Sequence, residues 1–226
     1  MVVIEQLFSA AEVADLRQFL DEIPWLDGRG TAMGMAADVK SNAQADASDP
    51  RVKVRVNQLL QRFGEHPLLV SAALPQRIFP PCFNRYRVEE TYGFHVDGAI
   101  MRLPDSSEVM RSDLSMTVFL SEPDEYEGGE LQIATEFGTQ SVKLPAGHAV
   151  LYPSSSLHQV TPVLRGERLA AICWMQSLVA DGAIRRSLFE LDQSIQALSA
   201  LLDTPRGELD RLHSVYHNLI RQFAQL

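Results

Sequence analysis

Two histidines and an aspartate in this sequence have the types and spacing of a metal-binding set. His95 and Asp97 lie two residues apart in the segment TYGFHVD, and His158 follows far downstream in the run LYPSSSLHQV. On a β-strand, residues two apart project from the same face. Two histidines and one carboxylate bind non-haem Fe(II) from one side and leave positions open for a chelating co-substrate and dioxygen. The three residues therefore predict an iron centre for oxidation chemistry.

Arg168, ten residues after His158, is a candidate partner for a carboxylate. It precedes the apolar run LAAICWM, and an arginine that enters such a strand needs an anion, because an unpaired buried charge is costly. Its guanidinium can hold a carboxylate through two parallel hydrogen bonds, a geometry that lysine lacks. We expect this anion to be a bound co-substrate.

The residues alone leave other kinds of site open. A His-x-Asp match is common by chance in a chain with many aspartates, so the pair gains weight only from the order and strand context of the larger set. One alternative is a zinc or manganese hydrolase in which the triad activates water. Another is a non-catalytic, cupin-like module that holds a small ligand. His95, Asp97, His158 and Arg168 together favour the iron oxygenase.

Most of the chain, most strongly from Phe83 to Gln176, resembles the PKHD-type hydroxylases, which are Fe(II)/2-oxoglutarate-dependent dioxygenases related to the prolyl 4-hydroxylases. In that class a tyrosine nine residues before the first metal histidine contacts the co-substrate, and another aromatic residue lies three before it. Tyr86 and Tyr92 stand at these positions. A basic residue ten after the distal histidine binds the far carboxylate of 2-oxoglutarate, which matches Arg168. Glu89 departs from the pattern, because prolyl 4-hydroxylases usually have a glycine there.

The resemblance implies an oxidoreductase in which His95, Asp97 and His158 bind Fe(II) while Tyr86 and Arg168 bind 2-oxoglutarate. It implies hydroxylation of a substrate with release of succinate and CO2, and L-ascorbate (vitamin C) as the reductant that keeps the iron in its Fe(II) state. The substrate stays open between an amino acid, a peptidyl residue and a small molecule related to iron uptake.

Composition limits the other partners. The chain has 226 residues, of which 46% are hydrophobic, and a formal net charge of −9 without a cluster of Lys and Arg, which argues against nucleic acid. No apolar run approaches the length of a membrane span, and the N-terminal residues lack the basic start of a signal peptide, so we expect a cytoplasmic protein without a membrane partner. Cys82 and Cys173 are expected to be free buried thiols.

Short segments between Gly, Pro and acidic turns predict a mainly β fold with flanking helices, whose core is a jelly roll, or double-stranded β-helix. Eight strands are expected to begin near Pro81, Gly93, Asp113, Gly129, Thr139, Gly147, Leu157 and Glu167. Arg165 and Gly166 are expected to form the tip of a hairpin that carries His158 on one strand and Arg168 on the next. A shift of one residue in strand register would turn Arg168 out of the barrel.

Three regions follow from the change of pattern along the chain. Residues 1–79 form an N-terminal helical region, 80–178 the dioxygenase core and 179–226 a C-terminal helical extension. The expected N-terminal helices are one capped by Ser9 with Glu12 as its capping-box partner, one over 51–63 and one over 67–73. The glycine-rich segment 27–50 is either a lid over the active site or a linker. In the C-terminal hairpin, Thr204 and Pro205 are expected to begin the second helix, and the hairpin to cover its own sheet or, alternatively, to form a homodimer.

Overall fold

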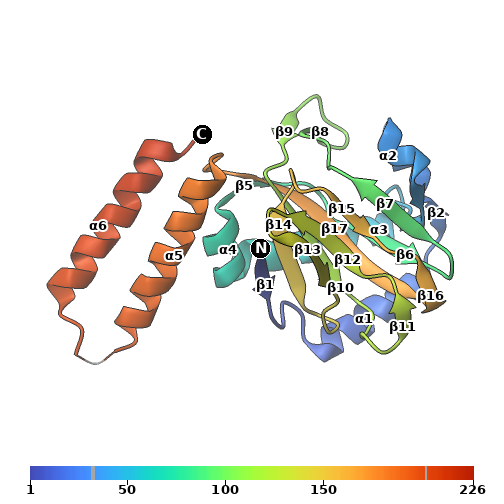
Figure 1. Ribbon diagram of the computed structural model, residues 1–226, viewed down its shortest axis with the longest axis horizontal. Coiled ribbons are helices and arrows are strands. Elements are labelled where there is room, and N and C mark those ends of the chain that lie inside the picture. The colour runs from blue at the N-terminus through green and yellow to red at the C-terminus, as the bar shows by residue number, and fades with distance from the viewer. Residues whose placement is uncertain (32–33, 202) are drawn as a thin grey trace.

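The computed structural model describes residues 1–31, 34–201 and 203–226. Its centre is a jelly roll of two β-sheets, and a pair of long helices stands apart from it at one side (Figure 1). The larger sheet has the strand order β1 (Val2–Ile4), β14 (Ala149–Pro153), β10 (Leu114–Phe119), β17 (Arg168–Ser177), β6 (Cys82–Tyr86), β4 (Ala43–Ala45) and β2 (Trp25–Asp27), and β5 (Pro75–Ile78) also pairs with β17. The smaller sheet has the order β13 (Gly138–Val142), β12 (Leu131–Thr135), β15 (His158–Val160), β7 (Thr91–His95) and β3 (Lys40–Ser41).

Two short ribbons and the helices complete the fold. The ribbons pair β11 (Tyr126–Gly128) with β16 (Val163–Gly166), and β8 (Ile100–Arg102) with β9 (Val109–Arg111). The helices are α1 (Ala10–Asp21), the 3-10 turn η1 (Gly28–Thr31), α2 (Met35–Asp38), α3 (Pro50–Glu65), α4 (Pro67–Ala73), α5 (Gly182–Ser199) and α6 (Arg206–Phe223). In the parts of the chain that the structure describes, no helix is both long and apolar enough to cross a membrane.

The larger sheet is buried on both faces, as its central strand β10 shows. Leu114, Met116 and Val118 pack into a core that also contains apolar residues of α1, α3 and α4. Phe119 points the other way, into a second apolar cluster between the two sheets, and all six residues of the strand are buried. Alternate side chains of β10 therefore point into two different spaces, one between the sheet and the helices and one between the two sheets.

All eight expected strands are present as β6, β7, β10, β12, β13, β14, β15 and β17, each beginning within two residues of its predicted start. Alternation and turn residues are local signals, which is why the strand positions could be predicted. The mainly β fold with flanking helices and the jelly-roll core are confirmed.

The hairpin expected at Arg165 and Gly166 is wrong. β16 pairs with β11, whereas β17 pairs with β10, β6 and β5, so the strand that carries His158 and the one that carries Arg168 belong to different sheets. Gly166 has φ 77°, and a Cβ there would lie 2.1 Å from the carbonyl oxygen of Glu125. The glycine thus marks a crossing between sheets, because a turn residue indicates a change of direction but not the strand that pairs beyond it.

The segment 27–50 is built into both sheets. β4 adds to the larger sheet beside β6, and β3 adds to the smaller sheet beside β7. Backbone groups of the segment thereby satisfy the sheet edges, so the interpretation as a plain linker is wrong. Figure 1 shows this segment in blue at the end of the jelly roll away from the helical hairpin.

The helix predictions hold except at one cap. Ser9 and Glu12 form the expected capping box of α1, and the side chain of Asp49 caps α3. The cap of α6 is wrong, because Pro205 is its N-cap residue and the hydroxyl of Thr204 instead donates to the carbonyl oxygen of Leu198.

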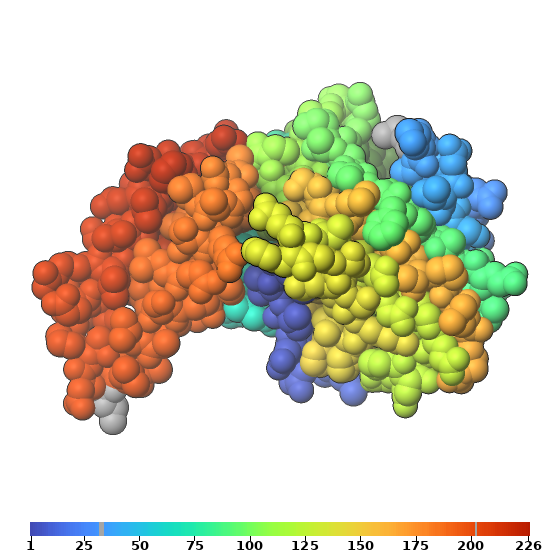
Figure 2. All heavy atoms as spheres, in the orientation of Figure 1, coloured from blue at the N-terminus to red at the C-terminus, as the bar shows by residue number. Residues whose placement is uncertain are grey.

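The C-terminal hairpin does not cover a sheet. α5 packs against α4 and α6, and both helices extend away from the jelly roll as a separate lobe (Figures 1 and 2). Its base contains the buried residues Leu74, Val179 and Leu188. The expected position was already taken, since α1, α3 and α4 cover the outer face of the larger sheet.

Candidate active site

The structure brings His95, Asp97 and His158 together. His95 ends β7 and His158 begins β15, and the two residues lie directly opposite each other in the pairing of these strands. His95 Nε2 lies 3.8 Å from Asp97 Oδ1, and His158 Nε2 lies 3.8 Å from Asp97 Oδ2. The candidate donor atoms of all three residues lie within 4.8 Å of one another. The expected convergence of residues from distant parts of the chain is therefore present.

Each histidine is held in one tautomer by a carbonyl two residues earlier. His95 Nδ1 lies 2.8 Å from the carbonyl oxygen of Gly93, and His158 Nδ1 lies 2.9 Å from that of Ser156. A carbonyl oxygen only accepts, so each Nδ1 carries the proton and each Nε2 keeps its lone pair for the shared space beside Asp97. Burial, together with neighbouring His158, lowers the pKa of His95 to about 4, which keeps its imidazole neutral.

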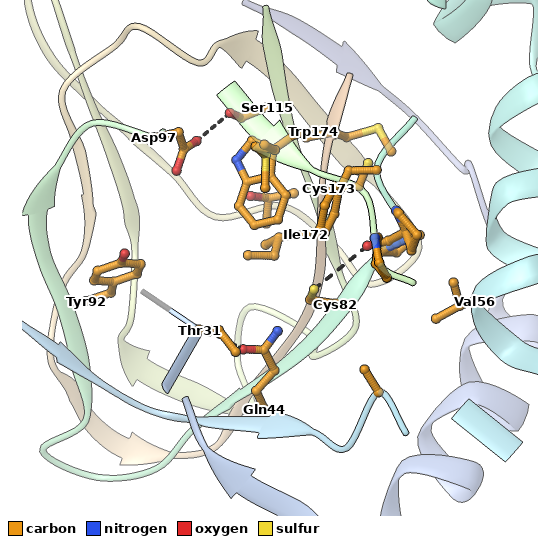
Figure 3. Close-up of a pocket in the computed structure, with 18 of the residues that line it drawn as sticks. Thr31, Gln44, Val56, Cys82, Tyr92, Asp97, Ser115, Ile172, Cys173 and Trp174 are labelled. Atoms are coloured by element: carbon orange, nitrogen blue, oxygen red, sulfur yellow. Dashed lines mark hydrogen bonds between the residues drawn. The ribbon is translucent and has the colours of Figure 1, made fainter. Parts of the chain in front are cut away.

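Asp97 is oriented by a chain of hydroxyl groups. Ser115 Oγ donates to Asp97 Oδ2 at 2.5 Å, as Figure 3 shows, and Ser115 Oγ lies 2.8 Å from Ser154 Oγ. The oxygen that accepts this hydrogen bond, Oδ2, faces His158, and Oδ1 faces His95. Hydrogen bonds of this kind fix the orientation of carboxylates that bind metals.

Two imidazoles and a carboxylate fit a divalent iron ion. Their candidate donor atoms lie within 4.8 Å of one another, and metal bonds to nitrogen and oxygen are about 2.0 to 2.2 Å, so one ion could contact all three after a small closing movement. The donors come from one side, which leaves the cavity side for other ligands.

Aromatic rings support both imidazoles. Tyr92 stacks on His95 with ring centroids 3.6 Å apart and an angle of 14° between the planes. Tyr152 meets His158 in an edge-to-face contact at 5.2 Å. Tyr152 lies opposite Ser115 in the pairing of β14 with β10, so both project into the space between the sheets.

Arg168 is a buried cation without a carboxylate partner. It begins β17 opposite Tyr86 and is 1% exposed, and its guanidinium carbon lies 5.3 Å from the ring centroid of Tyr86 and 5.4 Å from that of Phe119. Among the described residues no carboxylate lies within 4.0 Å of its guanidinium, and Nε has no hydrogen-bond partner. A buried charge of this kind is stable only with a counter-ion, so the residue fits an incoming anion.

The triad lines a cavity of about 670 Å³. In Figure 3, Tyr92, Asp97, Ser115 and Trp174 surround it, with Thr31 and Gln44 on the side formed by the segment 27–50. Tyr86 and Arg168 do not line this cavity. Tyr86 instead belongs to the apolar cluster between the sheets, and other members of that cluster, Leu131, Tyr152 and Val160, form part of the cavity wall.

The sequence interpretation missed several residues of the cavity. Tyr152 and Ser115 lie beside the triad, and Lys40, Thr31 and Gln44 come from the segment 27–50. Tyr152 and Ser115 could have been found from the sequence, because each is a polar residue in an apolar strand at a position whose side chain points into the space between the sheets. Lys40 and Gln44 lie in the run KSNAQ, whose resemblance to the N-terminal signature of the family implies a place near the mouth of the active site. The short strand carries no pattern that singles out Lys40 itself.

Glu89, where the sequence departs from the prolyl 4-hydroxylase pattern, has a backbone conformation that favours glycine. It has φ 70°, the left-handed region, and its backbone N–H donates to the carbonyl oxygen of Val163 at 2.9 Å. The departure from the pattern therefore changes the side chain while the backbone keeps the conformation that favours glycine.

Fold and site together define an oxygenase. A family model described as the 2OG-Fe(II) oxygenase superfamily matches residues 81–176, and one described as the PKHD-type hydroxylase C-terminal domain matches residues 182–225, which span the hairpin of α5 and α6. The chain is 66% identical over 226 residues to a PKHD-type hydroxylase of Shewanella frigidimarina, covering 100% of each chain. The chain belongs to the PKHD-type hydroxylase family.

Solved structures share the fold at low sequence identity. A Pseudomonas putida prolyl-4-hydroxylase has a TM-score of 0.50 at 20% identity, covering 78% of this chain and 91% of its own. HygX from Streptomyces hygroscopicus, solved with nickel and 2-oxoglutarate bound, has a TM-score of 0.51 at 13% identity and covers 79% of this chain and 83% of its own. These matches agree with the jelly-roll fold.

Proposed function

We propose that His95, Asp97 and His158 bind Fe(II), and that Arg168 and Tyr86 bind the far carboxylate of 2-oxoglutarate. The observation that carries the proposal is the buried guanidinium of Arg168, 1% exposed, without a carboxylate partner among the described residues and close to the cluster that borders the triad. HygX, which shares the fold, was solved with nickel and 2-oxoglutarate, which supports a metal ion together with 2-oxoglutarate here.

In this proposal the protein binds the metal and co-substrate, orients the metal ligands and keeps water away from them. The carbonyls of Gly93 and Ser156 hold the Nδ1 protons of the histidines, and Ser115 donates to Asp97. The rings of Tyr92 and Tyr152 shield the imidazoles from water. Bound Fe(II) would supply the oxidation of substrate by dioxygen, coupled to conversion of 2-oxoglutarate to succinate and CO2.

The rival interpretations account for fewer residues. In a hydrolase that activates water, Arg168 and Tyr86 have no co-substrate to bind, and the buried charge of Arg168 is left without a counter-ion. Membership of an oxygenase family also counts against both.

Succinate release tests the proposal. The purified protein, with 2-oxoglutarate and dioxygen, should form succinate only when Fe(II) is present, and His95→Ala should abolish this. His213→Ala is the matched control, because His213 is exposed on α6. Ascorbate should prolong turnover by keeping the iron reduced. Succinate formation that does not need Fe(II), or that survives in the His95 variant, contradicts the proposal.

We propose that the substrate is an amino acid, a peptidyl residue or a small molecule related to iron uptake. A cavity of about 670 Å³ is in the range of small-ligand sites. Comparing metabolites of a deletion strain with those of its parent should reveal an unhydroxylated compound that accumulates. If the two profiles agree under iron limitation and iron excess, the small-molecule alternative is wrong.

The remaining expectations on organisation stand as proposals. The division into 1–79, 80–178 and 179–226 is supported by the matched ranges 81–176 and 182–225. The cytoplasm as compartment is supported by two free cysteines, Cys82 and Cys173. Homodimerisation through the C-terminal helices is tested by light scattering, where a mass of one chain at micromolar concentration contradicts it.

A further inference from the structure

A second buried cation lies in the wall of the cavity, on the side formed by the segment 27–50. Lys40 pairs with Tyr92 across β3 and β7 and is 5% exposed. Its Nζ donates to Thr31 Oγ1 at 2.8 Å and lies 5.1 Å from the ring centroid of Tyr92, which in turn stacks on His95. The ammonium group is thus held close to the triad by the ring that supports one of its histidines.

Lys40 has no carboxylate partner within 4.0 Å among the described residues. The three residues that the structure does not describe, Ala32, Met33 and Leu202, are of uncharged types. An ammonium has three N–H groups, and Thr31 accepts from one of them, so donors are left for another acceptor. Burial lowers the pKa of the Lys40 ammonium, while Asp97 and Asp27 act from a distance in the opposite direction.

The surroundings of Lys40 differ from those of Arg168. Lys40 lines the wide cavity together with Thr31 and Gln44, whereas Arg168 lies outside the cavity wall between the rings of Tyr86 and Phe119. One buried cation is therefore placed for a ligand deep between the sheets and the other for a ligand in the cavity itself.

The charges of the loaded site leave Lys40 uncompensated. Given the proposed function, the two positive charges of Fe(II) and the one of Arg168 are balanced by Asp97 and the two carboxylates of 2-oxoglutarate. At the mouth, Lys53 and Asp105 lie 4.0 Å apart and offset each other. Burial raises the pKa of the Cys82 thiol to about 11, so this neighbour stays neutral. Among the charged residues that line the cavity, the positive charge left over belongs to Lys40; Asp27, which also acts on Lys40, is not part of the cavity wall.

We propose that Lys40 binds an anionic group of the substrate, and that the enzyme therefore acts on compounds that carry a carboxylate or a similar anion close to the hydroxylated carbon. This inference rests on the proposed function and specifies its substrate class. A buried ammonium that meets an anion gains a charge-assisted hydrogen bond, which a neutral analogue lacks. Lys40 would thus act as a specificity-determining residue, distinct from the co-substrate contact at Arg168.

The test uses matched pairs of probes. N-acetyl-L-amino acids and their C-terminal primary amides differ by one charge, and their affinities are measured by calorimetry on the full chain with Fe(II) and 2-oxoglutarate, without dioxygen. At least one acid should bind at least about tenfold more tightly than its amide. In Lys40→Met that preference should disappear while the affinities for amides and 2-oxoglutarate stay unchanged, and in Lys40→Arg it should persist.

Lys53→Met is the matched control, because Lys53 is an exposed lysine at the cavity mouth and its loss should leave the preference for acids unchanged. A measurement on the unmodified protein covers the case of a misfolded variant. Acetylation of Lys40 by acetic anhydride, followed by mass spectrometry, should slow when the preferred acid is bound but not with its amide.

Three results would overturn the inference: no acid in the panel is preferred over its amide, the preference survives in Lys40→Met, or Lys40→Met weakens 2-oxoglutarate binding as an Arg168 variant does. Failure of the unmodified protein to bind 2-oxoglutarate is a different outcome. It would contradict the proposed function itself, so the two failures are distinguishable.

Discussion

Replacing Arg168 with Met should stabilise the free protein and weaken co-substrate binding. The guanidinium is 1% exposed and has no carboxylate within 4.0 Å among the residues described, so in the free protein its burial is a cost. Methionine is similarly long and apolar, and it can fill the space between the rings of Tyr86 and Phe119. A residue present only for packing would give the opposite sign in the stability measurement.

The expected magnitudes follow from the contacts of Arg168. Exchange of buried ion pairs for apolar groups stabilises proteins by about 1 to 4 kcal/mol, with a middle value of about 2.5 kcal/mol. The two ring contacts of Arg168, at 5.3 and 5.4 Å, lie near the outer limit of about 6 Å for such contacts, so their loss offsets about 0.8 kcal/mol each. We expect a net gain of about 1 kcal/mol, which corresponds to a rise in Tm of about 2 to 4 °C for a chain of this size. Loss of one partner of a buried charge pair costs about 2 to 5 kcal/mol, so the Kd for 2-oxoglutarate should rise by about 30-fold to several thousand-fold.

Urea denaturation without ligands measures the change in stability of the free protein. The shift in Tm with added metal and 2-oxoglutarate measures the change in Kd for 2-oxoglutarate. Arg85→Met is the control, because Arg85 has a carboxylate partner, Glu167, at 3.7 Å and stacks on Trp25. It should lower stability and leave co-substrate affinity unchanged. If Arg168→Met lowers the stability of the free protein and changes the Kd by less than about twofold, the guanidinium is a structural element and the assigned role is wrong.

Three further changes test the site and its surroundings. Ser115→Ala removes the hydrogen bond to Asp97 and should weaken metal binding by about 10- to 100-fold in a metal titration; an unchanged affinity would mean that the carboxylate needs no such support. Glu89→Gly, at φ 70°, should raise the free energy of unfolding by about 0.5 to 1 kcal/mol in urea, and a decrease would show that the Glu89 side chain contributes to stability. Hydrogen exchange over Gly34 to Asn42 should slow when metal, 2-oxoglutarate and a bound acid are present, since η1, α2 and β3 flank the cavity; equal protection in both states would contradict a role as a lid.

Local signals in the sequence were enough to place the strands and the triad. Turn residues and alternation located eight strands of the jelly roll, because both signals depend on neighbours along the chain: β6, β7, β10, β12, β13, β14, β15 and β17. His95, Asp97 and His158 were identified by residue type, order and strand context. Arg168 was predicted to bind an anion because an unpaired charge in an apolar strand is energetically unfavourable. Its burial in the structure agrees with that reasoning.

Pairing between distant strands could not be predicted in the same way. Gly166 marked a turn, but the choice of β11 as partner for β16 depends on where Tyr126 lies in the folded chain. The position of the C-terminal hairpin was not predicted, because its apolar stripe does not specify the surface against which it packs. The outer face of the larger sheet is covered by α1, α3 and α4 instead. Lys40 was missed because its burial depends on β3 joining β7.

The position of the two histidines on neighbouring strands has a consequence for the lifetime of the bound metal. Each tautomer is fixed by a carbonyl two residues earlier in the chain, that of Gly93 for His95 and that of Ser156 for His158, whereas the meeting of the two rings depends on β7 lying beside β15. An ion held by both strands would act as a removable cross-link that closes the long chain segment between them. If departure of the ion required β7 to separate from β15, the rate of iron loss would level off with increasing chelator at the rate at which the smaller sheet opens. Departure through the cavity would instead let the rate keep rising with chelator, so the kinetics of iron release would report on a motion of the protein backbone.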